Sequence, residues 1–341
     1  MANKCMNILV TGSAGFLGAP LAFDLLSMGH KIIGIDSYVN SNSENTLKLE
    51  ENFKENYVFY KLDIASDSYA LDAIFIEHKP ELVLHLAALK SVQESISNPI
   101  LYKKNNIGST ANIINSMKSN DCKKIIYSSS AAVYGNQEIQ PIKENTDLKP
   151  ISTYADTKLA CEKLIEDACK ASYIDGIALR YFNPVGFHSS HLFKEFLNET
   201  DGTIMQEIIK VALRKNKSLK IYGNNYATKD GTCERDFIHI DDLMDAHIKS
   251  IDYINSFSGY DVFNVGTGNP ISILNLTKSF IEINNILIDY EFTQEKSGDI
   301  GTCYADTSKI TKLMKWKSKK NLKHMIRDSW VPYSTKSITK S

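Results

Sequence analysis

The 341-residue sequence has no long apolar run, few cysteines and almost no net charge. No run approaches the roughly 18 apolar residues of a membrane span, so no membrane partner is predicted. A formal net charge of -1 argues against a nucleic-acid partner, which would need a strongly basic surface. Six cysteines without a CxxC spacing are too few for a disulfide scaffold. Since the start also lacks a signal-peptide core, we expect a cytoplasmic protein with reduced thiols, and no metal site is predicted.

Short apolar runs alternate with longer amphipathic stretches in the first half of the chain. This pattern predicts an α/β fold with a doubly wound parallel Rossmann sheet, because strands covered by helices on both faces are apolar throughout. The pattern changes after Asn183, where a second, smaller α/β domain is expected. The predicted strands are Asn7–Val10, Lys31–Ile35, Tyr57–Leu62, Leu82–Leu86, Lys124–Tyr127 and Gly176–Leu179.

A glycine-rich segment, Thr11-Gly12-Ser13-Ala14-Gly15-Phe16-Leu17-Gly18, joins the first predicted strand to the first helix. Glycines let a backbone turn tightly against a pyrophosphate, and the helix N-terminus offers its free N–H groups to the phosphates. Asp36 closes the next strand, where a carboxylate accepts hydrogen bonds from the adenosine ribose and repels the extra phosphate of NADP. The segment therefore predicts an NAD site rather than ordinary turn glycines.

Two later segments have two interpretations each. Asp63 follows the third strand and either meets the adenine amino group or caps a helix. The small residues of His85-Leu86-Ala87-Ala88-Leu89-Lys90 either let the backbone approach the cofactor or serve packing.

Tyr154 and Lys158 lie four residues apart at the start of a predicted helix, so both side chains point the same way. A phenol is a poor base at neutral pH, and a nearby ammonium and the positive nicotinamide ring are both expected to lower its pKa. Tyr154 then accepts the proton of an alcohol while the adjacent carbon gives hydride to nicotinamide, and Ser130, at the end of the fifth strand, holds the same oxygen. A surface tyrosine beside a surface lysine is the usual meaning of YxxxK, but the phosphate loop and the strand-end serine favour catalysis.

From Asn7 to about Trp330 the sequence resembles the extended short-chain dehydrogenase/reductases and, within them, the UDP-glucose (UDP-galactose) 4-epimerases. Gly12, Gly15, Gly18, Tyr154 and Lys158 are motifs of the whole superfamily. The runs that point to the epimerases are His85–Val92, Ser128–Gly135, Arg180–Gly186, Tyr222–Thr232 and Arg235–His239.

The resemblance implies a site in two parts. The catalytic residues are Ser130, Tyr154 and Lys158. The NAD site comprises Gly12, Gly15, Phe16, Leu17, Gly18, Asp36, Asn40, Asp63, Ile64, Leu86, Ala87, Lys90, Asn105, Tyr154, Lys158 and Phe182. The nucleotide-sugar site comprises Asn183, Thr203, Tyr222, Arg235, Lys296, Asp299 and Cys303. Residues 1–183 and 235–267 are expected to form the NAD-binding domain, and 184–234 and 268–341 the nucleotide-sugar domain.

Three positions of the implied sugar site bear on the substrate. Lys296 stands where the family usually has an arginine and lacks its bidentate fork. Thr203 replaces an asparagine that contacts the substrate in the family. Cys303, four residues after Asp299, occupies a position where a tyrosine excludes N-acetylated sugars and a small residue admits them; alternatively, Cys303 is a buried small hydrophobe without influence on specificity.

The implied reaction inverts the fourth carbon of UDP-glucose or UDP-galactose, and of UDP-GlcNAc or UDP-GalNAc, through a 4-keto sugar with tightly held NAD. A nucleotide-sugar 4,6-dehydratase is the nearest alternative, but it usually has an Asp-Glu pair where Ala131 and Ala132 stand. A non-catalytic dinucleotide sensor tends to lose the Tyr and Lys that are present here. The resemblance also implies a homodimer that packs the helical stretches Tyr102–Ser119 and Thr153–Ala171.

Overall fold

The computed structural model describes residues 5–195, 197, 202–295 and 300–334. The chain divides into two compact units, and each consists of several chain segments. The first unit comprises the chain up to Val133, Leu148–Arg180 and Met244–Phe263. The second comprises Tyr134–Asp147, Tyr181–Leu243 and the chain from Asn264 onward.

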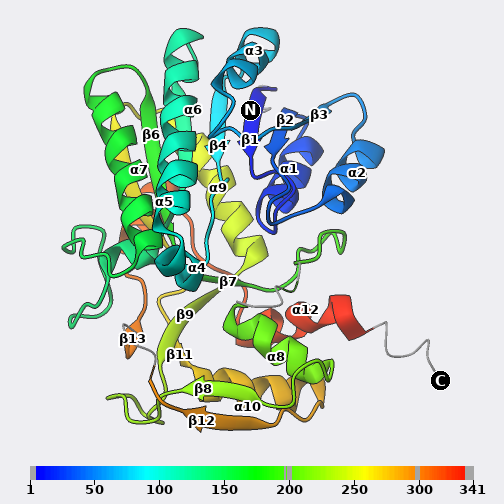
Figure 1. Ribbon diagram of the computed structural model, residues 1–341, viewed down its shortest axis with the longest axis vertical. Coiled ribbons are helices and arrows are strands. Elements are labelled where there is room, and N and C mark those ends of the chain that lie inside the picture. Colours follow the sequence, from blue (N-terminus) through cyan, green and yellow to red (C-terminus); the bar gives the residue numbers. More distant parts are fainter. Residues whose placement is uncertain (1–4, 196, 198–201, 296–299, 335–341) are drawn as a thin grey trace. The chain divides into compact units, whose positions relative to one another are not determined.

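Strands and helices alternate along the first unit (Figure 1). Its elements are β1 (Asn7–Thr11), α1 (Gly18–Ser27), β2 (Lys31–Asp36), α2 (Ser43–Asn52), β3 (Tyr57–Lys61), α3 (Ser68–His78), β4 (Leu82–His85), α4 (Val92–Ser97), α5 (Pro99–Tyr102), the π-helical turn η1 (Lys103–Ile107), α6 (Gly108–Ser119), β5 (Lys124–Ser130), the 3₁₀ turn η2 (Ala131–Tyr134), α7 (Thr153–Lys170), β6 (Asp175–Tyr181), α9 (Ile240–Ile254) and β10 (Tyr260–Val265). A few residues at the ends of η2, β6, α9 and β10 are counted with the second unit.

The seven strands form one sheet in the order β10-β6-β5-β4-β1-β2-β3. The pairs from β5 to β3 are parallel, and Leu9 of β1 lies opposite Val83 of β4 and Ile33 of β2. The order reverses between β1 and β4, so the carboxyl ends of these strands form the switch point at which such sheets bind ligands. The predicted α/β class with a parallel doubly wound sheet is confirmed.

A buried cluster on one face of this sheet explains the helical cover. Leu9, Val83 and Ile125 of the strands pack there with residues of α3, α6 and α7, including Phe75 and Cys161. Figure 1 shows α6 and α7 running beside one another over the strands. Their apolar stripes recur at helical spacing, and burial of those stripes against the strands fixes the helices in place.

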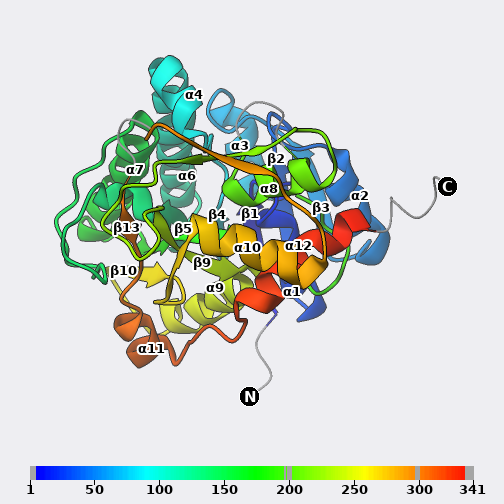
Figure 2. The same ribbon diagram turned by 90° about the horizontal axis from the view of Figure 1, so that it is seen from below.

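The second unit is the smaller α/β part of the chain. Its strands form a sheet in the order β11-β9-β13, with β7 also paired to β9, and a separate pair of β12 and β8. Helices α10 and α12 lie beside one another and share a core with Phe237 of β9 (Figure 2). The elements are β7 (Asn183–Val185), α8 (Ile204–Ala212), β8 (Leu219–Tyr222), β9 (Glu234–His239), β11 (Pro270–Ser272), α10 (Ile273–Asn284), β12 (Tyr290–Thr293), β13 (Thr302–Cys303), α11 (Ser308–Met314) and α12 (Leu322–Ser334).

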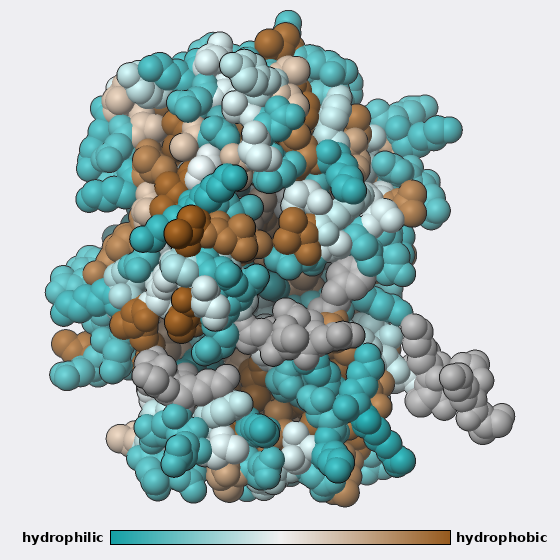
Figure 3. Space-filling view, in the orientation of Figure 1, coloured by the Kyte–Doolittle hydropathy of each residue, from teal (hydrophilic) through white to brown (hydrophobic). Residues whose placement is uncertain are grey.

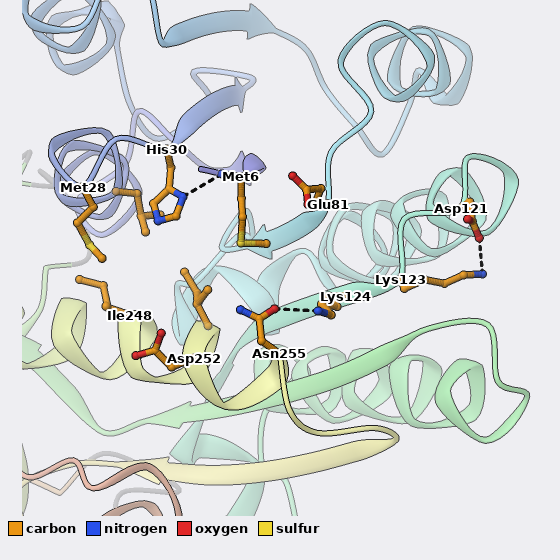
Figure 4. Close-up of a pocket in the computed structure, with 12 residues that line it drawn as sticks. Met6, Met28, His30, Glu81, Asp121, Lys123, Lys124, Ile248, Asp252 and Asn255 are labelled. Atoms are coloured by element: carbon orange, nitrogen blue, oxygen red, sulfur yellow. Dashed lines mark hydrogen bonds and ion pairs between the residues drawn. The ribbon is translucent and has the colours of Figure 1, made fainter. Parts of the chain in front are cut away.

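A pocket of about 420 Å³ opens in the first unit at the edge where the strands begin (Figure 4). Its charged side chains pair with their neighbours: Lys123 Nζ lies 2.7 Å from Asp121 Oδ1, and Lys124 Nζ donates to Asn255 Oδ1 at 2.8 Å. Since β5 begins here at Lys124 and ends at Ser130, this pocket lies at the opposite edge from the predicted catalytic residues.

Polar side chains cover most of the face in Figure 3, with apolar side chains gathered where Figure 1 draws α4 and α5. The exposed apolar residues of these two helices are Val92, Ile96, Ile100 and Leu101. Among the described helices, none has the length and apolar character to cross a membrane.

Candidate active site

The glycine loop packs against the segment that follows β4. Gly12 has a φ of +70°, and a Cβ there would lie 2.9 Å from the backbone N of Ala87. At Gly18 a Cβ would lie 2.0 Å from the carbonyl oxygen of Gly12. Backbone fills the space on both sides of the loop, so these two positions require glycine. The loop is thereby held tightly at the switch point.

The N-terminus of α1 is open to an anion. Its N-cap residue is Leu17, which makes no side-chain hydrogen bond to the helix, and the first turn carries no acid. By contrast, Asn42 and Asp67 cap α2 and α3 with their side chains. An uncapped helix start with free N–H groups fits the pyrophosphate of a dinucleotide.

Asp36 lies at the end of β2 and supports the same loop. Its carboxylate accepts hydrogen bonds from Ala14 N at 3.1 Å, Tyr38 N at 2.9 Å and Ser41 Oγ at 2.9 Å. A carboxylate has about four lone-pair sites, so three bonds leave room for a ribose hydroxyl. The residues present therefore fit NAD.

The remaining predicted cofactor residues differ in exposure, and all except Phe182 lie in the first unit. Asp63 is exposed and accepts from Ala65 N and Ser66 Oγ, whereas Asp67 caps α3. Asn105 is half-buried on η1. Phe182 is buried and belongs to the second unit. The other positions are half-buried Phe16, Leu17, Leu86 and Ala87, buried Ile64 and exposed Asn40 and Lys90.

Ser130, Tyr154 and Lys158 come together in the first unit. Ser130 ends β5, and Tyr154 and Lys158 lie in the first two turns of α7, which Ser152 caps. Lys158 Nζ donates to the carbonyl oxygen of Ser128 at 2.7 Å and lies 5.9 Å from the centre of the Tyr154 ring. Ser130 makes a side-chain hydrogen bond with Tyr154.

Burial shifts the pKa values of both members of the pair. Burial raises the pKa of Tyr154, and the hydrogen bond from Ser130 opposes this shift. Burial also lowers the pKa of Lys158 to about 8. In the chain without cofactor, desolvation thus dominates at the phenol, and the lowering expected from Lys158 together with a positive nicotinamide ring remains a prediction.

Sequence reasoning missed a buried polar network around this trio. Asn106 of η1 accepts from Leu89 N at 2.8 Å and donates to Leu89 O and to Thr157 Oγ1 at 2.9 Å. It ties the segment after β4 to the helix that carries Lys158. Glu162 and Arg180, which form a buried ion pair, were also missed. A signal for Glu162 is its place one turn after Lys158 beside core residue Cys161.

Five predicted sugar-site residues lie among the described residues of the second unit, and four of them are considered first. Asn183 of β7 is opposite Phe237 of β9, and Tyr222 ends β8 opposite Thr293. Thr203 caps α8, where its Oγ1 accepts from Gln206 N at 3.4 Å. Arg235 Nη1 donates to the carbonyl oxygens of Glu234 at 2.9 Å and Ile300 at 2.6 Å.

Cys303 lies in β13 directly opposite Arg235 of β9. It is half-buried, and burial raises the pKa of its thiol to about 11, against the opposing charge of Arg235. The thiol is therefore neutral at physiological pH. Lys296 and Asp299 lie outside the described residues.

The first unit has the features of a nicotinamide enzyme of the short-chain dehydrogenase/reductase type. These features are a glycine loop on an uncapped helix, an acid at the end of β2 and a Tyr–Lys pair beside a strand-end serine.

Comparison with known proteins agrees with this class. The family described as GDP-mannose 4,6 dehydratase matches residues 9–329. The UDP-glucose 4-epimerase of Bacillus subtilis is 38% identical over 326 residues, which cover 95% of this chain and 96% of the relative.

Two solved structures are also similar. The UDP-glucose 4-epimerase of Stenotrophomonas maltophila, crystallised with NAD and formylated UDP-arabinopyranose, has a TM-score of 0.93 and 33% identity and covers 98% of this chain and 99% of that one. The UDP-Glc/GlcNAc 4-epimerase of Campylobacter jejuni has a TM-score of 0.85 and 29% identity, with coverages of 97% and 99%. This chain belongs to the UDP-glucose 4-epimerase family of the extended short-chain dehydrogenase/reductases, and it is an NAD-dependent enzyme of the isomerase class.

Proposed function

We propose that this chain inverts the fourth carbon of a UDP-hexose, interconverting UDP-glucose and UDP-galactose. The observation that carries the proposal is the grouping of Ser130, Tyr154 and Lys158 at the carboxyl end of β5. These residues supply a proton acceptor, a hydroxyl that holds the reacting oxygen and a buried positive charge. They serve an alcohol oxidation whose later reversal gives the inverted alcohol, with no net redox change.

In the proposed mechanism, Tyr154 Oη takes the proton of the sugar 4-hydroxyl, while Ser130 Oγ holds the same oxygen. NAD, which the glycine loop and Asp36 would hold, would supply reversible hydride-acceptor chemistry for C4. Lys158 stabilises the phenolate through its charge, and its bond to Ser128 fixes the ammonium. After the 4-keto sugar presents its other face, Tyr154 gives the proton back.

The two units take different ligands in this proposal. The segments 1–183 and 235–267 hold NAD through the glycine loop, Asp36 and the positions around them. The segments 184–234 and 268–341 hold the nucleotide sugar. Arg235 is proposed to bind the diphosphate because its guanidinium is the strongest phosphate fork among the predicted sugar residues. Asn183, Thr203, Tyr222, Lys296, Asp299 and Cys303 complete the proposed sugar site.

Because the matching family carries the name of a 4,6-dehydratase, dehydration is the alternative. That reaction removes a proton from C5 and expels the 6-hydroxyl, so it needs an acid and a base beyond Tyr154. The residues directly after Ser130 are Ala131 and Ala132, whose methyl groups can do neither. The positions that would carry dehydration are therefore chemically inert, and this favours epimerisation.

We also propose that the enzyme accepts UDP-GlcNAc and UDP-GalNAc. Cys303 presents a small neutral thiol where a tyrosine ring would fill the space needed by an acetamido group. The similarity to the Campylobacter jejuni enzyme named for both UDP-Glc and UDP-GlcNAc supports this breadth.

We further propose a cytoplasmic homodimer. The exposed apolar residues of α4 and α5 support a partner surface next to η1 and the predicted helical stretches, because side chains such as Ile100, 82% exposed, favour contact with another chain. Light scattering coupled to gel filtration measures the mass, and a 38.3 kDa particle at micromolar concentration contradicts the dimer.

The test of function is product formation without added NAD. Purified protein is incubated with UDP-galactose, UDP-glucose, UDP-GalNAc and UDP-GlcNAc, and the products are separated by chromatography. The proposal expects the C4 epimer of each substrate and no 4-keto-6-deoxy sugar. A dehydrated product supports the alternative, and no conversion of any substrate refutes catalysis on these sugars.

A further inference from the structure

Behind the predicted catalytic trio lies a buried ion pair between α7 and β6. Glu162 and Arg180 are each 3% exposed. Arg180 Nε donates to Glu162 Oε1 at 3.0 Å, and Nη2 donates to Oε2 at 2.6 Å, so the guanidinium forms a bidentate fork. Glu162 follows Lys158 by four residues, so both side chains lie on the same face of α7.

The carboxylate also binds the end of β5. Ser129 donates its hydroxyl to Glu162 Oε1. Its neighbour Ser128 accepts the hydrogen bond of Lys158, and its other neighbour Ser130 hydrogen-bonds Tyr154. Three successive residues of one strand are thus each bonded to α7. One bond comes from a backbone carbonyl and two from hydroxyls, so a shift of the end of β5 relative to α7 would displace all three.

Fold stability alone explains this pair poorly. Taking two charges out of water costs several kcal/mol per ion, and buried ion pairs can often be replaced by apolar residues without loss of stability. Neighbouring positions of the same helix, such as Cys161 and Ile165, are filled by apolar residues. A carboxylate at residue 162 therefore calls for an explanation at the site it faces.

The groups that Glu162 faces include the ammonium of Lys158, one turn earlier on α7. Burial lowers the pKa of Lys158 to about 8, and Cys161 and then Glu162 oppose this shift. Burial raises the pKa of the Cys161 thiol, so this thiol is neutral at pH 7 and Glu162 carries the opposing negative charge. The titratable and charged groups around Lys158 and Glu162 are His85 of β4, Tyr127 of β5, Tyr154 and Cys161 of α7, Arg180 of β6 and Tyr260 of β10.

We propose that Glu162 is a positioning residue of the epimerase: its carboxylate, clamped by Arg180, holds the end of β5 in register with α7 and keeps the ammonium of Lys158 charged beside Tyr154. This inference rests on the proposed roles of Ser130, Tyr154 and Lys158. Glu162 itself contacts neither cofactor nor substrate in this proposal, since it acts through Ser129 and Lys158.

The central variant is Glu162→Gln, which keeps the shape and the acceptor oxygen but removes the charge. Its matched control is Glu166→Gln, the same change one turn later on α7, where Glu166 pairs with Lys170 at the surface at 2.7 Å. The double variant Glu162→Met/Arg180→Met removes both buried charges together and leaves no unpaired ion. Ser129→Ala removes the strand contact and leaves the ion pair in place.

Each full-length protein, with its copurified NAD, is assayed with UDP-galactose from pH 6 to 10, and its unfolding in urea is followed separately. We expect kcat of Glu162→Gln to fall about 10- to 100-fold. The guide to this magnitude is the loss typically caused by changing an outer residue that orients a metal ligand. The alkaline limb of its pH profile should move about one unit lower, because an opposite charge nearby shifts a pKa by this order. KM should change little.

The double variant decides between positioning and folding. The proposal is supported if the double variant is stable, has a reduced kcat and shows the alkaline limb of its pH profile at lower pH. It is also supported if Ser129→Ala has a reduced kcat while the alkaline limb of its pH profile stays in place. The proposal is overturned if folded Glu162→Gln has the kcat and pH profile of the wild type. If Glu162→Gln does not fold, the same result in the double variant overturns it. If Glu166→Gln shows the same shift, the effect is general to α7 and the proposal also fails. An inactive wild type overturns the proposed function and this inference together, whereas an active wild type with indifferent variants overturns the inference alone.

Discussion

Replacement of Gly18 by alanine should detach the cofactor without unfolding the chain. The added Cβ would lie 2.0 Å from the carbonyl oxygen of Gly12, 2.7 Å from its carbonyl carbon and 2.9 Å from Ser13 Cα. All three obstacles are backbone atoms, so no side-chain rotation relieves the contact. Since carbon atoms approach favourably to roughly 3.5 Å, the loop has to retreat by more than about 1 Å.

A retreat of this size breaks hydrogen bonds between the loop and a phosphate. A hydrogen bond to a charged group contributes about 1.5–3 kcal/mol. Because 1.4 kcal/mol corresponds to a factor of ten, loss of one such bond weakens NAD binding roughly 10- to 100-fold, and loss of two weakens it about 10²- to 10⁴-fold. The strain in the loop costs a further amount of about 1–3 kcal/mol of stability.

The assay compares NAD content in gently purified proteins. The wild type is expected to carry NAD without any addition, because the reaction regenerates the cofactor in every cycle. Dinucleotide released by denaturation is quantified per chain, together with epimerase activity and the urea midpoint. Gly108→Ala is the matched control, since Gly108 starts α6 and an added Cβ meets nothing within 4 Å there. Full NAD content and wild-type activity in Gly18→Ala would refute the reasoning.

Four further outcomes are expected. Tyr154→Phe should keep the fold and bound NAD but lower kcat about 10²- to 10⁴-fold, because the ring cannot take a proton; near-normal turnover contradicts the mechanism. Cys303→Tyr should abolish turnover of UDP-GalNAc and spare UDP-galactose in the chromatographic assay, and unchanged UDP-GalNAc turnover contradicts the gate. Burial holds the pKa of Lys158 at about 8, below its ordinary 10.5, so between these values the unfolded chain keeps a proton that the folded chain has lost. As pH rises through that window, kcat should fall because Lys158 loses its charge. Over the same window the contribution of Lys158 to the free energy of unfolding should rise, and Lys158→Met should remove this rise in urea titrations. Asp236→Asn should lower the free energy of unfolding by about 1–3 kcal/mol, because its buried carboxylate accepts from Thr267 N, Gly268 N and Ala305 N, and an amide nitrogen in its place leaves a donor unsatisfied; an unchanged urea midpoint contradicts this.

Local patterns were enough to predict six of the seven strands of the sheet, all except β10. β4 is buried at all four positions, and β1 and β2 are buried at most of theirs, so their apolar runs stand out in the sequence. The glycine loop was predictable for a similar reason, since backbone contacts at Gly12 and Gly18 exclude every side chain there. Such features depend on a few consecutive residues, which a pattern can display.

The helix predicted for Tyr102–Ser119 is present, but it contains a π-helical segment that no local pattern indicates. The structure has α5 ending at Tyr102, the π-turn η1 and then α6. Asn106 within η1 bonds Leu89 and Thr157, which are 17 and 51 residues away in the chain. A π-helical segment within an α-helix commonly marks a functional position, and here it carries the residue that bonds these distant partners. No window of the sequence contains those partners.

The burial of the charged Glu162 side chain was likewise not predictable from the sequence pattern. Glu162 and Glu166 stand on the same helix four residues apart, yet Glu162 is 3% exposed while Glu166 pairs with Lys170 at the surface. Helical periodicity places both near the same face, and the buried carboxylate is the one that meets Arg180 of β6 and Ser129 of β5. A strand about twenty residues further along the chain thus contributes to the environment of a helical residue.

The raised pKa of Tyr154 gives the Tyr–Lys pair a different meaning from the one its spacing suggests. In the chain alone, burial keeps the proton on the phenol, and Lys158 is bonded to Ser128. A positive charge brought next to a buried phenol favours its ionised form, and removal of that charge restores the phenol. An oxidised nicotinamide ring is positive and a reduced one is neutral. In the proposed mechanism, Tyr154 would therefore act as a base when hydride leaves the sugar and as an acid when hydride returns, which is the order that inversion at C4 requires.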